Sequence, residues 1–129
     1  MTAAIVTITE ETLGGVRKIL FAITTDSSAG TATATTTSKY TGVINRVVVD
    51  PGSGGTVFTT GFSVTLKDED GYDLLNAQGA SLVNTAVTQK GSGDITGTLN
   101  NDKIALAVSA AGNSKVGNVV VYVVDISHP

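Results

Sequence analysis

Hydrophobic and polar residues alternate along much of this chain. The clearest alternation lies in residues 62–67, where Phe62, Val64 and Leu66 share one face and polar residues share the other. A period of two places successive side chains on opposite faces of a strand, one buried and one in water. The segment 103–110 repeats this pattern, so both segments predict strands of an antiparallel sheet. The residues expected to point inward in the second segment are Ile104, Leu106 and Val108.

Two further strands are predicted near the N-terminus, in "AIVTITEET" (4–12) and "VRKILFAITTD" (16–26). In the first, Val6 and Ile8 share one face and threonines share the other. A strand is favoured over a helix in the second segment because no capping residue precedes it and branched residues are frequent. One face of the second segment holds Arg17, Ile19, Phe21 and Ile23.

The closing segment, "VGNVVVYVVDI" (116–126), is apolar on both of its faces. Val120, Tyr122 and Val124 alternate there with three more valines. Strands that are buried on both faces read as continuous hydrophobic runs. We therefore expect this strand to be central in its sheet, or to be covered by a partner on its second face.

The connections between these strands are rich in small residues. The segment 27–42 consists mainly of Ser, Thr, Ala and Gly, which bury little apolar surface, so we expect a flexible surface loop at about 27–41, or an edge. "PGSGG" (51–55) is predicted to be the tip of a long hairpin that joins the segment "VINRVVVDP" (43–51) to the strand at 62–67. Two short strands are expected in "NTAVTQ" (84–89) and "DITGTLNND" (94–102), and a turn is expected in "AAGNSK".

Together these segments predict an all-β protein, an antiparallel β-sandwich of about eight strands. The length of 129 residues fits a single domain over residues 1–129. A jelly roll is the eight-stranded form of such a sandwich and is preferred here over an immunoglobulin-like fold, which has seven.

Composition and charge exclude several classes of function. The chain has no Cys, a net charge of −3, and eight Lys and Arg residues that are scattered rather than clustered. Nucleic-acid binders concentrate basic residues to neutralise phosphates, so no nucleic-acid partner is expected. The longest apolar run, Val119 to Val124, is too short to cross a membrane, and the start is not a signal peptide. We expect a soluble protein made in a cytoplasm.

The acidic stretch "LKDEDGYDLLNAQG" (66–79) is the main candidate for chemistry. If Gly71 takes the sixth position of a calcium loop, the first and twelfth positions fall on Leu66 and Ala77, which supply no side-chain oxygen. An irregular calcium site and a catalytic carboxylate pair both stay open, with Asp68, Asp70 and Asp73 as the residues concerned.

A structural connection explains the acidic stretch better. Asp70 and Gly71 form a turn signal, and Asp73 is placed to cap one helical turn that ends with Gly79 at its C′ position. Leu74 and Leu75 would then close one end of the sandwich.

Other candidate sites carry weaker signals. His128, the only histidine, lies next to the C-terminus, where a general base would lack the packing that holds it in place. The glycine loops "GSGDITG" and "PGSGG" lack the lysine of a phosphate-binding loop. No catalytic, cofactor-binding or metal-binding residue is therefore assigned, and the chain is not expected to be an enzyme.

The segments "SVTLKDEDGYDLLNAQGASLVN" and "TGTLNNDKIALAVSAAGNSKVGNVVVYV" resemble small virion proteins of tailed bacteriophages. In such proteins a strand ends in a D-x-x-G-x-D-L-L-like turn, and a final hairpin of the kind L-x-V-x-x-A-G-x-x-x-x-G-x-V-x-V-Y follows. The resemblance covers roughly Gly61 to Asp125, about half of the chain. Within this group the chain is most similar to head decoration, or cement, proteins.

The resemblance implies a virion structural protein that decorates the outer surface of the capsid. It would bind between subunits of the major capsid protein as a homo-oligomer, a trimer or a dimer, and so stabilise the shell. Two segments are candidates for ordering on the shell: Ser27 to Thr41 and the tip at Pro51 to Gly55. The alternatives are a tail-, fibre- or baseplate-associated module that binds a carbohydrate or receptor, and a small hydrolase.

Overall fold

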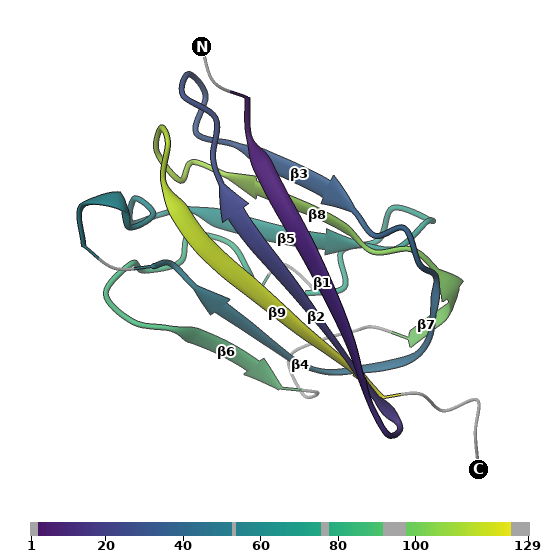
Figure 1. Ribbon diagram of the computed structural model, residues 1–129. Coiled ribbons are helices and arrows are strands. Elements are labelled where there is room, and N and C mark those ends of the chain that lie inside the picture. The colour runs from purple at the N-terminus through teal and green to yellow at the C-terminus, as the bar shows by residue number, and fades with distance from the viewer. Residues whose placement is uncertain (1–2, 53, 76–77, 92–97, 125–129) are drawn as a thin grey trace.

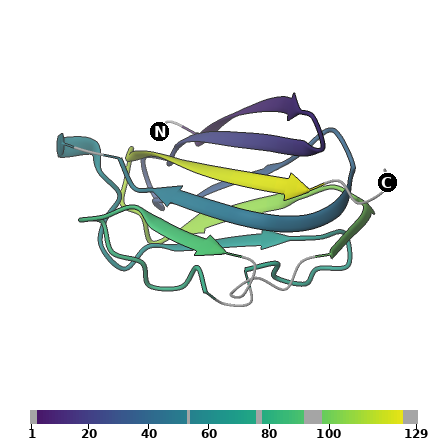
Figure 2. The same cartoon turned by 90° about the horizontal axis from the view of Figure 1, so that it is seen from below.

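A computed structural model describes residues 3–52, 54–75, 78–91 and 98–124. These residues form an all-β protein in which two antiparallel sheets are stacked on each other (Figures 1 and 2). The predicted sandwich is confirmed at this level. The described residues contain nine strands and one short 3₁₀ helix, η1 (Gly54–Thr56), rather than the eight strands expected.

The larger sheet has the strand order β1-β2-β9-β4-β6, and β7 also pairs with β4. The smaller sheet has the order β3-β8-β5. The strands of the larger sheet are β1 (Ile5–Leu13), β2 (Val16–Thr24), β9 (Val116–Val124), β4 (Tyr40–Asp50), β6 (Thr88–Gly91) and β7 (Thr98–Asp102). Those of the smaller sheet are β3 (Ala32–Thr35), β8 (Ala105–Ser109) and β5 (Ser63–Lys67). The closing strand β9 is central, as its two apolar faces predict.

The core fills the space between the two sheets. On β9 the inward residues Val119, Val121 and Val123 are fully buried. The alternation seen in the sequence correctly identifies the inward residues of β2, β5 and β8, because each of these strands has one face on the core. The core residues on those three strands, which the alternation predicts, are Ile19, Phe21, Ile23, Val64, Leu66, Leu106 and Val108.

Pairing between the strands is nested along the chain. β2 pairs with β9, β3 with β8, and β4 with both β6 and β7. Residues 73–75 and 78–82 lie beside β5, with isolated bridges between Lys67 and Asp73 and between Phe62 and Leu82. Strands of the first half of the chain are thus joined to strands of the second half in reverse order.

This nesting corrects two predictions of hairpins. The strands on either side of "PGSGG" are β4 and β5, and they belong to different sheets. The strands on either side of "AAGNSK", β8 and β9, are also in different sheets. Both connections cross from one layer to the other. Among the described strands, β1 and β2 are the consecutive pair that forms a hairpin.

The strand count differs because the Thr-rich segment contains β3, an edge strand of the smaller sheet. Ala32, Thr36 and Tyr40 are buried there, although the segment is rich in small polar residues. The short strand expected at 84–89 lies later, as β6 (Thr88–Gly91). Of the strand expected at 94–102, only residues from 98 onward lie among the described residues, as β7.

The loops at one end of the sandwich are tied closely to one another. The buried Thr25 hydroxyl donates a hydrogen bond to the carbonyl of Gly112 (2.7 Å) and accepts one from the backbone N–H of Lys115 (2.8 Å). A Cβ on Gly30 would lie 2.8 Å from the backbone nitrogen of Gly112. Because the backbones approach so closely, glycine is required there.

Candidate functional site

The acidic stretch folds as a tight turn that uses its own carboxylates. One oxygen of Asp68, Oδ1, accepts hydrogen bonds from the backbone N–H groups of Asp70 and Tyr72, both at 3.0 Å. Gly71 has a φ of +86°, a left-handed conformation that glycine adopts without strain. The turn therefore satisfies its own backbone, as the interpretation of the stretch as a connection predicts.

Asp73 brings the following leucines into the core. Its Oδ1 accepts hydrogen bonds from the backbone N–H groups of Leu75 (3.0 Å) and Leu66 (3.4 Å). Leu74 and Leu75 are buried, as predicted. Of the predicted helical turn at 74–78, residues 76 and 77 lie outside the described residues. The backbone N–H of Gln78 donates a hydrogen bond to the carbonyl of Leu75 (2.8 Å) across the turn.

The prediction that Gly79 takes a left-handed C′ conformation is wrong. Gly79 is not among the residues with positive φ, and its carbonyl accepts a hydrogen bond from the backbone N–H of Val64 (2.8 Å). A Cβ at this position would overlap the carbonyl oxygen of Val64. Glycine is required because the segment runs directly against β5, not because of its dihedral angles.

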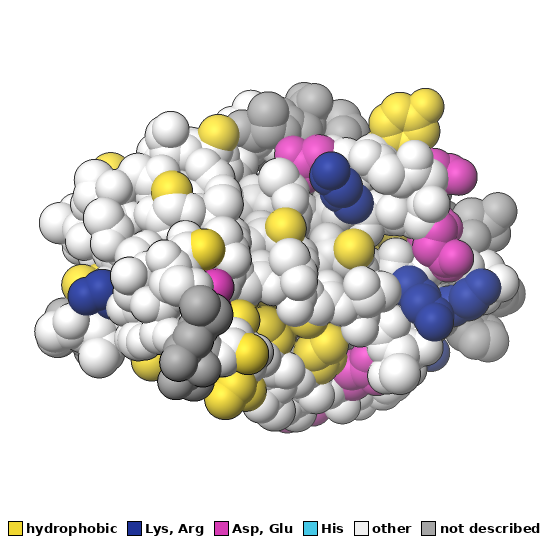
Figure 3. Space-filling model, turned by 90° about the horizontal axis from the view of Figure 1, so that it is seen from above, with side chains coloured by type: hydrophobic (Ala, Val, Ile, Leu, Met, Phe, Trp, Pro, Cys, Tyr) yellow, Lys and Arg dark blue, Asp and Glu magenta, His cyan; other side chains and the backbone are white. Residues whose placement is uncertain are grey.

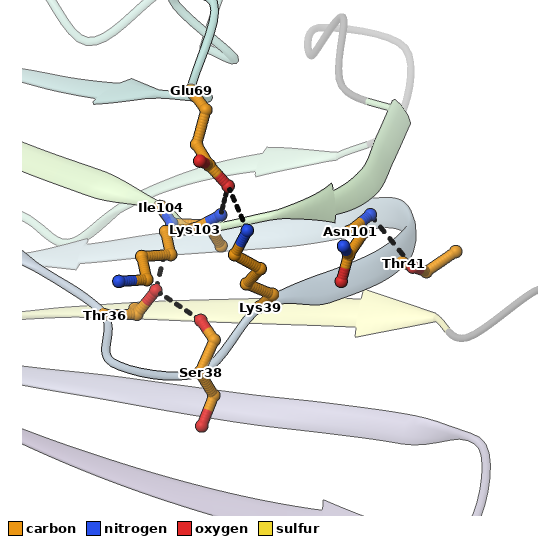
Figure 4. Close-up of polar contacts among 8 residues, drawn as sticks. All are labelled: Thr36, Ser38, Lys39, Thr41, Glu69, Asn101, Lys103 and Ile104. Carbon is orange, nitrogen blue, oxygen red and sulfur yellow. Dashed lines mark hydrogen bonds and ion pairs between the residues drawn. The ribbon is translucent and has the colours of Figure 1, made fainter.

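Glu69 anchors the acidic turn to the neighbouring loops (Figure 4). Its carboxylate lies 3.7 Å from the Lys39 ammonium and accepts a hydrogen bond from the backbone N–H of Lys103 (3.0 Å). Nearby, the Thr36 hydroxyl accepts a hydrogen bond from the backbone N–H of Ile104 (3.0 Å). In the part of the chain that the structure describes, no group of three His, Cys, Asp or Glu side chains is arranged to hold a metal ion.

A small polar pocket lies where the β1–β2 hairpin meets the start of β4. Its volume is about 170 Å³. The Ser38 hydroxyl donates a hydrogen bond to the Glu10 carboxylate across it (3.1 Å). The lining residues are Glu10, Glu11, Thr12, Arg17, Lys18, Ser38 and Tyr40. The lining contains two carboxylates, two cationic side chains and three hydroxyl groups. The pocket can therefore accept hydrogen bonds from a small neutral polar group and donate hydrogen bonds to it.

Tyr40 is the most unusual group in this pocket. Its side chain is 4% exposed, and among the described residues its hydroxyl has no partner that meets hydrogen-bond geometry. Burial, followed by the neighbouring Glu10 carboxylate, raises the pKa of Tyr40 well above its usual range. The phenol therefore stays neutral at physiological pH. No local sequence signal marks this pocket, because its residues come from three separate segments.

The second candidate surface is the outer face of the larger sheet, the face turned away from the core. The described residues form two layers, and none of the described strands forms a third layer over this face. Leu20, Val120 and Val48 lie side by side across the centre of this outer face, on β2, β9 and β4. All three are only partly buried. Two of the exposed large hydrophobic side chains, Ile5 (59%) and Val116 (44%), belong to the strands at one end of the same face.

The third candidate surface lies on the segment between β5 and β6. Its exposed apolar side chains are Tyr72 (73%), Val83 (49%) and Val87 (48%), which we call the β5–β6 surface. This segment runs along the side of the sandwich away from β1 and β2 (Figure 2). Tyr72 lies next to the Lys67 end of β5 and Val83 next to the Phe62 end, so these side chains are spread along the segment, and a partner would have to lie along it to contact them.

Charge is distributed unevenly over the molecule. Seen from above, most of the surface is uncharged, and the charged side chains gather toward the end where β7 lies in Figure 1 (Figure 3).

His128 lies outside the described residues. Among the residues described, no helix has the length and apolar character needed to cross a membrane. Comparisons with protein-family models, with curated proteins and with solved structures found no match.

Proposed function

We propose that this chain is a non-enzymatic virion structural protein that decorates the outer surface of a bacteriophage capsid and stabilises it. The observation that carries the proposal is the β5–β6 surface. Tyr72, Val83 and Val87 are exposed large apolar side chains on a segment that forms two isolated bridges with the β5 region. Such side chains are expected to be buried by a protein partner, and the resemblance to decoration proteins makes the major capsid protein that partner.

Binding of this kind would stabilise the shell by mass action. A protein that binds only the assembled capsid shifts the equilibrium toward that state, by an amount set by its concentration and affinity. A contact of roughly 800 Å² per partner is ordinary for a specific protein complex. Because a capsid repeats the same site many times, even modest affinity at each site would strengthen the whole shell.

The nested strand pairing supports a jelly roll as the finer description of the fold. In a jelly roll, a long antiparallel pair of chain halves is rolled into two sheets, so strands pair in reverse order along the chain. The pairs β2–β9, β3–β8 and β4–β6 follow this order. Residues 73–75 and 78–82, beside β5, take the place of the remaining strand.

Co-sedimentation with undecorated heads tests the proposal. Purified protein is expected to sediment with heads and to raise the temperature at which they rupture. The double variant Val83→Ser and Val87→Ser, combined with Tyr72→Ala, should weaken this binding at least about tenfold, because the apolar contact is removed. Ala29→Ser, at an exposed position on another loop, is the control and should bind as the wild type does.

Two results would contradict the proposal. One is the absence of any association between folded protein and heads at tens of micromolar. The other is association that is unchanged in the triple variant, which would show that the β5–β6 surface does not make the contact.

A second function is favoured by the polar pocket: a tail-, fibre- or baseplate-associated module that binds a carbohydrate. The mixed carboxylate, guanidinium and hydroxyl lining of the pocket matches sugar hydroxyl groups. It ranks second because sugar sites usually offer an exposed aromatic ring, and the one ring in the lining, Tyr40, is buried. Binding on a glycan array that is lost in Arg17→Ala would favour this function over decoration.

A further inference from the structure

The outer face of the larger sheet is organised in rows that run across the strands. The central row holds Leu20, Val120 and Val48, paired in register on three adjacent strands. The next row toward one end contains Ala22, Asn118 and Asp50, and the next toward the other end contains Lys18, Tyr122 and Arg46. The two outermost rows are again largely apolar. On β2 and β9 they are Thr24 and Val116 at one end, with Ile5 of β1 beside them, and Val16 and Val124 at the other end, with Val43 of β4 beside them.

This order of rows is symmetric about the central one. On β9, reading from either end, an outer valine is followed by a polar or amphipathic residue and then by the apolar centre, and on β4 Asp50 and Arg46 flank Val48 in the same way. On β2 the centre is apolar, but only one of its two flanking residues, Lys18, is polar. A surface that must fit itself across a two-fold axis needs this symmetry, because each row then meets its counterpart from the opposite end. A surface shaped for an unrelated partner has no such requirement.

We propose that a second copy of this chain covers the outer face, with the two-fold axis lying along the central row. The two larger sheets then pack face to face, with their strands antiparallel across the interface. Leu20, Val120 and Val48 meet the same residues of the second copy at the centre. At the two ends, Thr24 and Val116 of one copy meet Val16 and Val124 of the other.

The charges on this face fit the arrangement. Asp50 and Arg46 lie on the same strand, β4, on either side of the central row. The two-fold axis therefore brings Asp50 of one copy over Arg46 of the other, twice in the dimer. Arg46 is exposed, and its guanidinium lies 5.5 Å from the centre of the Tyr122 ring and donates a hydrogen bond to Gln89 (2.6 Å). These contacts hold the charge on the outer face, where a partner carboxylate can reach it.

The size of the face also suits a dimer. β1, β2 and β9 have nine residues each, which gives a strand length of about 30 Å. The four long neighbouring strands at about 4.8 Å spacing make the face roughly 19 Å wide, and the four residues of β6 extend one edge. The area of roughly 640 Å² per copy reaches the low end of a standard interface, about 600 Å² per partner. Two sheets packed in this way would bury their inner rows as a β-sandwich does.

Sedimentation velocity of the purified chain, from 1 to 200 µM, tests the proposal without any capsid. The wild type is expected to sediment with twice the mass of the monomer at the higher concentrations. Leu20→Lys places an unpaired charge at the centre of the face and should weaken dimerisation about 100-fold. Ala107→Lys is the matched control at the centre of the smaller sheet's outer face, and it should leave the dimer unchanged.

A charge exchange tests the two-fold axis itself. Arg46→Glu brings two carboxylates together across the axis, the introduced one of one copy and that of Asp50 of the other, and should weaken the dimer about tenfold. Adding Asp50→Lys restores opposite charges and should bring the dissociation constant back to within about threefold of the wild type. Thermal melting of each variant confirms that it is folded, since Asp50 also accepts a hydrogen bond from the backbone N–H of Gly52 (2.9 Å).

A wild type that stays monomeric at 200 µM would overturn the proposal. So would a dimer that Ala107→Lys disrupts and Leu20→Lys does not. If Leu20→Lys instead prevents binding of a monomer to heads, the face belongs to the capsid contact and the second copy is excluded. The proposed function is tested separately from the dimer. A dimer that does not bind heads would contradict decoration, but it would still support self-association through the outer face.

Discussion

The two faces of strand β9 have nearly the same residues and different surroundings. Val119, Val121 and Val123 point into the core and are fully buried, while Val120, Tyr122 and Val124 point outward and are only partly buried. Folding explains the first set, because burial of apolar side chains between the sheets is the main stabilising term. It explains less of the second set, which keeps part of its surface exposed in the described chain and is the set that the proposed second copy would cover.

The largest difference between the two faces of β9 is expected when a charge is introduced on each face separately. Val121→Asp buries a carboxylate without a partner, which costs several kcal/mol and should remove the folded state, since the total stability of a domain is only about 5–15 kcal/mol. Val120→Asp leaves the charge in water and should fold. Circular dichroism and urea unfolding at 1 µM separate the two outcomes. Equal loss of structure in both variants would show that both faces belong to the core.

Two glycines of the larger sheet provide a matched pair for the next effect. Gly117 lies on the inner face of β9, where a Cβ would approach the Phe58 ring to 2.6 Å and the Asp50 carbonyl oxygen to 2.8 Å. Gly91 lies on the outer face of β6, where a Cβ would have no neighbour within 4 Å. Gly117→Ala should therefore cost about 2–3 kcal/mol of unfolding free energy, and Gly91→Ala should be neutral or slightly stabilising. Urea unfolding measures both, and an equal cost in the two variants would contradict the packing described.

Much of the fold could be predicted from the sequence because the inward residues alternate with polar ones. The inward faces of β5 and β8 and the central position of β9 follow from this pattern. The pattern cannot say which sheet a strand joins, because an inward valine looks the same in either layer. Pro51 and the glycines after it fit a hairpin tip and a crossing between layers equally well, so the hairpins were predicted wrongly.

The candidate surfaces were harder to predict because they depend on neighbours that are distant in the chain. The segment 27–41 was predicted as a loop or an edge, and it contains the edge strand β3; the strand's bounds could not be predicted because its small residues carry no amphipathic signal, although Ala32 is buried. Gly79 is glycine because of the Val64 backbone, fifteen positions before it, and no local rule indicates that approach. The pocket around Tyr40 unites residues 10–12, 17–18 and 38–40 for the same reason.

Tyr40 is a buried polar side chain among the apolar residues on the inner face of the larger sheet. It makes the free energy of unfolding depend on pH. Its pKa in the folded state is raised by burial and by Glu10, whereas in the unfolded chain it is about 10. The neutral phenol is therefore favoured by folding, and this stability is complete below about pH 10 and is lost as the pH rises above it. Tyr40→Phe should remove that loss between about pH 10 and 11, as measured by urea unfolding. A wild type and variant with equal pH slopes would contradict the burial of the hydroxyl.

The smallest effect is expected at Asp26, which lies on a loop outside both faces. Hydrogen bonds from the backbone N–H groups of Thr31 first, and of Ala29 and Gly30, lower the pKa of its carboxyl. A lowered pKa stabilises the fold above the unfolded value of about 3.9 and ceases to do so as the pH falls through the folded value. Asp26→Asn should therefore melt slightly below the wild type at pH 7, and the difference should shrink below about pH 4. A difference that grows in acid would contradict the direction of the shift.

Electron microscopy of the parent virion tests the central claim most directly, namely that this sandwich works through its surfaces on a capsid. Density for the chain is expected on the outside of the head, as pairs joined through their larger sheets. Tyr72, Val83 and Val87 are expected to face the major capsid protein. Density for the chain on the tail, or its absence from the particle, would contradict this claim.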